Sequence, residues 1–426
     1  MAPSRIQAAA FAQRVRTGSN LMLVVLFLVA LVAPLAGLNR SGVDQMIART
    51  ERRTAAAFPK LELRWHGPIL FPKKQTMRVF PHEFETWFND HVGGRRHLIQ
   101  AYNLAKVCGL TAETYSQPAV GKAAQSPVII GREGWLFWTG EFLLEDFRRT
   151  RPFSAEELGR WKAVLEARHD WLARRGVQYI LFIAPNQQEI YSEFMPRAIN
   201  RVGARSRFDQ LKAVLAGGRV TLVDPRAALT AAKSREQTYF KTDTHWNDFG
   251  AFVGYREICT ALQPRFPNLQ PRALDDFHIA VRDDEGMYVA TLVDSLVPFR
   301  ERLVTLTPRH PRTAKSEGVP PPADSRAAMV TRNPNGVLGS AIVVHDSFMH
   351  WLGPYLSEHW RHMHLMWHDD FPAEYLEEII RRERPQVLIQ EMVERKLMRI
   401  EPRNPPQVDA EVRSYGVAQK PRDSIR

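Results

Sequence analysis

Two short segments of the chain carry the side chains of a serine-type active site. An apolar run from Gly339 ends at His345-Asp346-Ser347 and leads directly into a helical pattern. A serine at the start of a helix lies next to exposed backbone N–H groups, which can stabilise a developing oxyanion. Ser347 is therefore a candidate nucleophile, although serine also favours this position as a simple helix cap.

The second segment, YFKTDTHWNDFGAF, holds Asp243 and His245 two positions apart. A neutral imidazole accepts the proton of a serine hydroxyl, and a carboxylate fixes the tautomer of that imidazole. The spacing suits a turn that directs both side chains toward one site. Taken without Ser347, an Asp-x-His pair is more often a surface feature, so the catalytic interpretation depends on the two segments meeting.

A third segment, LIQEMVERKL, supplies Glu391 and Arg395 at the end of another apolar run. These two residues form an ion pair beside the site, contact a polar substrate, or simply begin a solvated helix. For the oxyanion, the backbone N–H of Ser347 is one candidate donor. The side chain of Asn186, at the end of a further predicted strand, is a second.

Six histidines gather between residues 345 and 368, namely His345, His350, His359, His362, His364 and His368. No His-Glu-x-x-His pattern occurs there, and alternation along HMHLMWH places only His362, His364 and His368 loosely on one side. The sequence therefore predicts no metal site and no cofactor.

The elements that would position these groups alternate between apolar strands and amphipathic helices. Ser154 and Glu157 form a capping-box pattern before a helix that ends at Gly176. Buried parallel strands are predicted at 177–185, 219–225, 339–348, 364–367 and 386–391, helices at 249–263 and 372–384, and an opening hairpin at 128–138. In such an α/β fold, ligands bind at the carboxyl ends of the strands, where Ser347 would lie.

Domain boundaries follow from changes in this pattern. Residues 39–125 are expected to form a linker region with short helices. One of these helices is predicted over 84–107, with an interruption at Gly93-Gly94. Residues 126–400 predict the α/β domain. Within this domain, the segment 265–335 is Pro-rich and aperiodic, so we expect it to be an insertion or mobile loop. After the domain, we expect residues 401–426 to form a disordered tail.

Composition excludes several classes of protein. With 44% hydrophobic and 24% charged residues in 426, the chain is neither disordered nor a multi-span membrane protein. The net charge of +12 suits an acidic polymer, but the basic residues are scattered and accompany no recognisable nucleic-acid module, so we expect no nucleic-acid partner. Cys108 and Cys259 are too few for a disulfide scaffold and leave one optional disulfide.

Residues 20–38, NLMLVVLFLVALVAPLAGL, are nineteen positions without a charge, about the length that crosses a bilayer. Arginines precede this run and no acidic residue occurs before Asp44, which predicts residues 1–19 in the cytoplasm and the body of the chain in the periplasm. A cleaved signal peptide is the competing interpretation. Pro34 disrupts its small-x-small motif, and the run is long for such a peptide, which favours a retained anchor.

Five motifs together resemble one known family: GREGWLFW (131–138), FIAPNQQEIY (182–191), TDTHWN (242–247), HDSF (345–348) and QEMVER (390–395). They are similar to motifs of the SGNH-hydrolase-like O-acetyltransferases of the alginate acetylation type, in which Asp-x-His-Trp precedes the serine. The resemblance covers about residues 80–400. The chain departs from the family pattern at His345, Gln187 and Lys396, where the family usually has Gly, Lys and Tyr.

The resemblance implies an SGNH-like parallel sheet flanked by helices, with Ser347 as nucleophile, His245 as base and Asp243 as its orienting carboxylate. Apart from the resemblance, we expect Asn186, Trp246, Glu391 and Arg395 near these three residues, as substrate contacts or supports. The expected function is periplasmic transfer of an acetyl group to hydroxyls of an exopolysaccharide. A multi-span membrane partner would supply the acetyl group, and the chain would be anchored in the bacterial inner membrane.

Two alternatives remain at this point. The same triad would serve an esterase that removes acetyl groups from a glycan, because water competes with sugar as acceptor. A different class is a non-catalytic glycan-binding or assembly subunit of an export complex, which the unusual His345 would suit. A fold alone does not decide between these activities.

Overall fold

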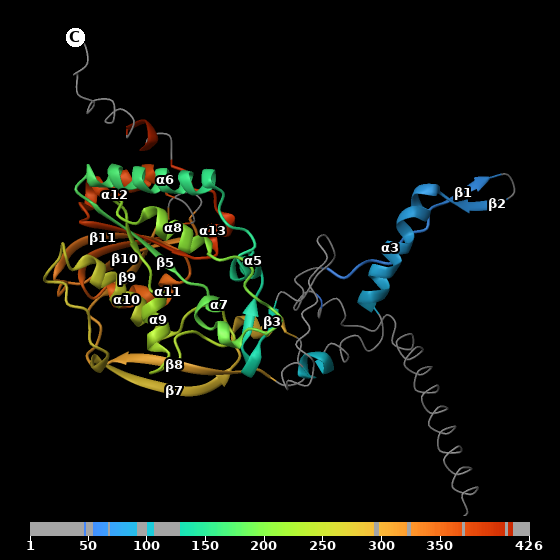
Figure 1. Ribbon diagram of the computed structural model, residues 1–426, viewed down its shortest axis with the longest axis horizontal. Coiled ribbons are helices and arrows are strands. Elements are labelled where there is room, and N and C mark those ends of the chain that lie inside the picture. Colours follow the sequence, from blue (N-terminus) through green and yellow to red (C-terminus); the bar gives the residue numbers. More distant parts are fainter. Residues whose placement is uncertain are drawn as a thin grey trace, which may run out of the picture. The chain divides into compact units, whose positions relative to one another are not determined.

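The computed structural model describes residues 47, 54–66, 69–91, 100–105, 128–293, 298–321, 325–368, 371–404 and 408–411 (Figure 1). The chain forms two compact units. The smaller comprises residues 1–111, 118–126 and 291–298, and the larger comprises 112–117, 127–290 and 299–426.

In the smaller unit, strands β1 (Leu63–His66) and β2 (Ile69–Pro72) form an antiparallel hairpin that leads into helix α3 (Lys74–His91). The helix begins earlier than the predicted residue 84, because Phe80, Phe84 and Phe88 recur every fourth position and stack along one face. Residues 100–105 are also helical, and the predicted break at Gly93-Gly94 lies outside the described residues.

Among the helices that the structure describes, none combines the length and the apolar character needed to span a bilayer. The predicted anchor at 20–38 and Cys108 lie outside the described residues. Cys259 is a buried free thiol.

The larger unit is built on a seven-stranded sheet in the order β6-β5-β13-β11-β12-β10-β9. Its strands are β5 (Gln178–Ala184), β6 (Thr221–Val223), β9 (Lys315–Val319), β10 (Ala327–Arg332), β11 (Leu338–His345), β12 (Trp360–Trp367) and β13 (Val387–Val393). The strands from β6 to β12 are parallel, as predicted, whereas β10 and β9 are antiparallel additions at one edge. The sheet is therefore mixed, and the prediction of a wholly parallel sheet was wrong at that edge.

Helices cover both faces of this sheet (Figure 1). Helices α6 (Ala155–Ala173), α8 (Arg207–Leu215) and α12 (Ala373–Glu383) pack with Ile342 and Val344 of β11. Helices α10 (Asp248–Leu262) and α11 (Met349–Leu356) and the shorter α9 (Arg226–Ala232) pack with Ala341 and Val343 on the opposite face. Because successive side chains of a strand point to opposite faces, a strand covered on both sides reads as a continuous apolar run.

Several local predictions are confirmed. Ser154 accepts from the backbone N–H of Glu157, whose carboxylate accepts from the N–H of Ser154, so the capping box forms at α6. The opening hairpin is present as β3 (Val128–Ile130) and β4 (Leu136–Trp138). Three short helices complete the larger unit: α5 (Leu143–Arg148), α7 (Gln187–Ile190) and α13 (Lys396–Arg399).

The segment 265–335 differs from its prediction as an insertion or mobile loop. It contains β7 (Phe277–Glu285) and β8 (Arg300–Pro308), which pair as an antiparallel hairpin, as well as β9 and β10 of the main sheet. The side chains of β7 are nearly all exposed, so no alternation of apolar and polar residues marks it as a strand.

The predicted disordered tail also begins too early. Arg168 on α6 donates to the carbonyl oxygen of Arg403 and to Oδ1 of Asn404. Glu411 forms ion pairs with Arg174 and Arg175 at the end of the same helix. These bonds hold residues 401–404 and 408–411 against α6, and the rest of the tail lies outside the described residues.

Candidate active site

The side chains of Asp243, His245 and Ser347 lie in hydrogen-bonded order. His245 Nδ1 lies 2.6 Å from Asp243 Oδ1. Since an ionised carboxylate only accepts hydrogen bonds, Nδ1 carries the proton and donates it. The lone pair of the neutral ring is then on Nε2, to which Ser347 Oγ donates over 2.7 Å. This is the geometry in which an imidazole can accept the serine proton.

Ser347 occupies the turn between β11 and α11, at the carboxyl end of a central strand. Asp346 shapes that turn from beneath: its Oδ1 accepts from the N–H of Phe348 and its Oδ2 from the N–H of Val393 on β13. Lys396 Nζ lies 3.1 Å from the same Oδ2. Asp346 thus connects the turn that carries Ser347 to the neighbouring strand β13.

The two buried carboxyl groups at this turn, Asp346 and Glu391, have pKa values that are shifted in opposite directions. Burial alone would raise the pKa of Asp346, but Lys396 and the two backbone N–H groups hold it below its ordinary value. Glu391 Oε2 accepts from the N–H of Asp346, and burial together with the charge of Asp346 raises the pKa of Glu391 well above its ordinary value. The pKa values of the two neighbouring carboxyl groups are thus shifted in opposite directions, and Lys396 lies where it stabilises the charge of Asp346.

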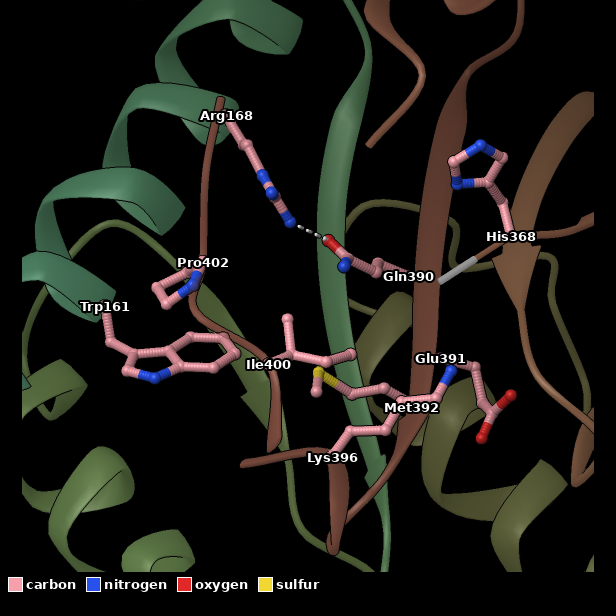
Figure 2. Close-up of a pocket in the computed structure, with 9 residues that line it drawn as sticks. All are labelled: Trp161, Arg168, His368, Gln390, Glu391, Met392, Lys396, Ile400 and Pro402. Carbon is pink, nitrogen blue, oxygen red and sulfur yellow. Dashed lines mark hydrogen bonds between the residues drawn. The ribbon is translucent and has the colours of Figure 1, made fainter. Parts of the chain in front are cut away.

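Glu391 belongs to a polar region on both sides of β13. Figure 2 shows Gln390 and Glu391 pointing to opposite sides of the strand, with Gln390 directed toward Arg168. Gln390 Oε1 accepts from Arg168 and from the hydroxyl of Tyr179. Glu391 is 2% exposed. That burial places it as a support of the Ser347 turn rather than as a contact for a large substrate.

The loop that carries Asp243 and His245 is held by a residue of the segment predicted as an insertion. Glu301 on β8 is fully buried, and its carboxylate accepts from the N–H groups of Lys241 and Thr242 and from the Thr242 hydroxyl. At the other end of the loop, Asn247 caps α10 by accepting from the N–H of Gly250. Both attachments lie within a few residues of His245.

Aromatic rings surround the histidine. The His245 ring packs at 4.7 Å from Phe348 and 4.9 Å from Trp351, measured between centroids. Trp246 is fully buried, and its indole N–H donates to the carbonyl oxygen of Phe348. Trp246 therefore connects the two loops of the triad from within the core, where a substrate does not reach it.

The remaining predicted residues lie in other contacts. Asn186 Nδ2 donates to Asp146 at 2.7 Å, and within the described residues no hydrogen bond joins Asn186 to the triad. Arg395 pairs with Glu141 rather than with Glu391, so, of the three roles considered for Glu391 and Arg395, the mutual ion pair is not the one that the structure describes. The guanidinium of Arg395 also lies over the ring of Phe348.

Sequence reasoning did not find Glu301, Asp346 or Trp351 as parts of this site. Asp346 lies within the HDSF motif and Trp351 follows three residues after it, so their closeness to Ser347 in the sequence was an available signal. Glu301 lies in a polar segment with no motif around it, and no pattern in the sequence connects it to Thr242.

Comparison with known proteins identifies the class of this α/β domain. A family model described as "SGNH hydrolase-like domain, acetyltransferase AlgX" matches residues 128–350, which is more than half of the chain. The chain therefore belongs to this family of SGNH hydrolase-like domains. The matched region contains all three residues of the hydrogen-bonded triad.

Individual relatives match a smaller part. A "Probable alginate O-acetylase AlgJ" of Pseudomonas putida is 29% identical over 136 residues, which are 32% of this chain and 34% of that protein. Its counterpart in Azotobacter vinelandii is 25% identical over 137 residues, again 32% and 34%. The chain thus aligns with about a third of the length of these relatives.

Two solved structures are similar at low identity. The O-acetyltransferase domain of Pseudomonas putida AlgJ has a TM-score of 0.47 at 21% identity, covering 68% of this chain and 99% of that chain. Bacillus cereus PatB1 has a TM-score of 0.48 at 16% identity, covering 63% and 96%.

Proposed function

We propose that this protein is an O-acetyltransferase that moves an acetyl group through Ser347 onto hydroxyls of an exopolysaccharide or cell-envelope glycan. The observation that carries the proposal is the unbroken sequence of hydrogen bonds from Ser347 through His245 to Asp243. Membership of the AlgX family and similarity to proteins named alginate O-acetylases support acetyl transfer as the reaction.

The reaction is a double displacement. Ser347 Oγ attacks the carbonyl carbon of an acetyl ester while its proton passes to His245 Nε2, and Asp243 stabilises the imidazolium. The tetrahedral intermediate collapses, the ester bond to the donor breaks, and the leaving oxygen takes the proton from His245. A glycan hydroxyl then attacks acetyl-Ser347 by the same path in reverse, which restores the serine and yields the acetylated glycan.

Location and partners form part of the same proposal and depend on the sequence. Residues 20–38 would anchor the chain in the bacterial inner membrane with the α/β domain in the periplasm. A single anchor cannot carry an acyl donor across a bilayer, so a multi-span membrane partner would deliver the acetyl group. The net charge of +12 favours an acidic glycan as acceptor.

The test is intact-protein mass spectrometry of the purified full chain after exposure to p-nitrophenyl acetate. We expect one acetyl adduct on the wild type, its absence from Ser347→Ala, and a much slower adduct in His245→Ala. Ser234→Ala is the matched control, because Ser234 is exposed and its hydroxyl only donates to the carbonyl oxygen of Ala231. Its adduct should equal that of the wild type.

The acceptor is then identified by adding acidic and neutral glycans to the acetylated protein. Transfer of the acetyl group to a glycan supports the proposal, whereas release only as free acetate would make the protein an esterase. No adduct on a folded wild type, or an equal adduct on Ser347→Ala, would refute the nucleophile and favour a binding or assembly role.

A further inference from the structure

A second group of chemically active side chains lies under helix α12. His362 and His364 are alternate residues of β12 and therefore lie on one face of the sheet. Glu383, the last residue of α12, reaches both: its Oε2 is 2.8 Å from His362 Nε2, and its Oε1 is 3.3 Å from His364 Nδ1. One ligand atom from each residue lies within 4.8 Å of the others.

This group is separate from the triad. His362 is the third and His364 the fifth of the eight residues of β12, whereas Ser347 follows the carboxyl end of β11, and the two strands are parallel neighbours. The group therefore lies beside residues 340–342 of β11, well before the carboxyl end of the strand that Ser347 follows. Any role it has does not require contact with the reacting atoms.

Hydrogen bonding fixes which nitrogen of His364 can bind a cation. The hydroxyl of Tyr375 donates its one proton to the carbonyl oxygen of Pro320 at 3.1 Å. Its 3.2 Å contact with His364 Nε2 therefore needs a proton on Nε2, which donates to the Tyr375 oxygen. Nδ1 is then the nitrogen of His364 that faces the Glu383 carboxylate at 3.3 Å, so a cation bound between them would be held by Nδ1 and a carboxylate oxygen.

Arg382 and Ser340 define the surroundings in which such an ion would lie. Arg382 donates to Glu383 Oε1 at 2.9 Å, which leaves Oε2 directed at His362. Ser340 is the register partner of His362 on β11, so both lie on the same face. Its buried Oγ has no hydrogen-bond partner among the described residues, and a metal-bound water would satisfy it.

We propose that His362, His364 and Glu383 bind a zinc ion that clamps α12 to β12. Two imidazoles and one carboxylate are a ligand set that zinc accepts, with water in the fourth position. Zinc bonds of about 2.0–2.1 Å require ligand atoms roughly 3.3 Å apart, so the three side chains need only small rotations to close on the ion. The bond from His364 to Tyr375 orients the ring, as the outer partners of metal-binding histidines generally do.

The sequence prediction of no metal site considered histidine spacing alone. It placed His362 and His364 on one side correctly, but the third ligand comes from a helix nineteen residues beyond His364. No short motif describes a site that is formed by a strand and the end of the following helix.

The experiment is titration of the chelator-treated full chain with zinc chloride by calorimetry, together with visible absorption of the cobalt form. We expect one zinc per chain, a tetrahedral cobalt spectrum, and a rise in melting temperature on adding zinc. Tyr375→Phe should weaken zinc binding by about 10- to 100-fold. His362→Gln and Glu383→Gln each remove a ligand and should weaken it further.

The matched control is His310→Gln, because His310 is an exposed histidine outside the group, and it should bind zinc as the wild type does. Failure of the folded wild type to bind zinc would overturn the proposal. Unchanged binding in both His362→Gln and Glu383→Gln would also overturn it, because the zinc would then lie elsewhere. Acetyl loading of Ser347, measured separately, tests the proposed function independently.

Discussion

Replacement of Glu301 by Gln is expected to damage the candidate active site without touching it. The Glu301 carboxylate accepts five hydrogen bonds: from the N–H groups of Lys241, Thr242 and Arg302, from the Thr242 hydroxyl and from the Gln237 side chain. A glutamine keeps one accepting oxygen and turns the other into an N–H₂ group. The less costly orientation places that group where Oε2 accepts two bonds from Thr242.

The magnitude follows from those two bonds. A buried donor left without an acceptor costs about 1–3 kcal/mol. The N–H of Thr242 loses its acceptor outright. Its hydroxyl, which accepts from the N–H of Met287 at 2.8 Å, can accept from the new N–H₂ group only by turning its own proton away from the acceptor that it has in the native protein. We therefore expect Glu301→Gln to lower the free energy of unfolding by about 2–5 kcal/mol. A shift of about 1 Å in the adjacent Asp243 would slow acetyl loading of Ser347 about 100-fold.

Urea denaturation followed by tryptophan fluorescence measures the first effect, and the rate of acetyl-Ser347 formation under folding conditions measures the second. Glu317→Gln is the matched control, because Glu317 on β9 forms only an exposed ion pair with Arg332. We expect it to change stability by less than about 0.5 kcal/mol. A Glu301→Gln protein as stable and as quickly acetylated as this control would refute the role assigned to Glu301.

Four further substitutions test other features. Gly250→Ala would place a Cβ 2.0 Å from the carbonyl oxygen of Thr238, so we expect the free energy of unfolding measured in urea to fall by about 1–3 kcal/mol. A Cβ at Gly159 on α6 would meet no atom within 4 Å, so we expect Gly159→Ala to raise the same free energy by about 0.5–1 kcal/mol. Burial and the charge of Glu189 raise the pKa of Asp146 to about 7. The folded chain therefore binds the extra proton, and stability falls as the pH rises from about 4 through 7. Asp146→Asn should flatten that decline in denaturation curves from pH 4 to 9, and an unchanged slope would argue against the shift. Ser154→Ala removes the cap of α6 and should cost about 1 kcal/mol in the same assay, and a loss below about 0.3 kcal/mol would contradict the cap.

The central strands could be predicted from the sequence because burial on both faces leaves a direct signature. β5 (QYILFIA) is an almost continuous apolar run and β13 begins with one (VLI), and the boundaries of both strands were predicted to within one or two residues. β9 has no such signature: its residues, KSEGV, are nearly all exposed. An edge strand that is open to solvent has the composition of a loop, since only its backbone pairing defines it.

Some residues of the candidate site could likewise be predicted from the sequence, and others could not. Asp243, His245 and Ser347 could be predicted because few residue types can serve as nucleophile, base and orienting carboxylate in a serine-dependent active site. Glu301 could not, because its role depends on five donors that the fold brings around one carboxylate. Trp246 illustrates the reverse case: its motif predicted it near the site, but only the structure shows that it supports the loops from the core.

The order of strands in the sheet has a consequence for biosynthesis. β13 lies between β5 and β11, so the two halves of the parallel sheet cannot join until the ribosome has released residues 387–393. The same strand, followed by Lys396, supplies the partners that hold Asp346 beneath Ser347. A nascent chain that ends before β13 would therefore contain every residue of the triad and still lack an organised nucleophile, which keeps the serine unreactive until synthesis and folding are nearly complete.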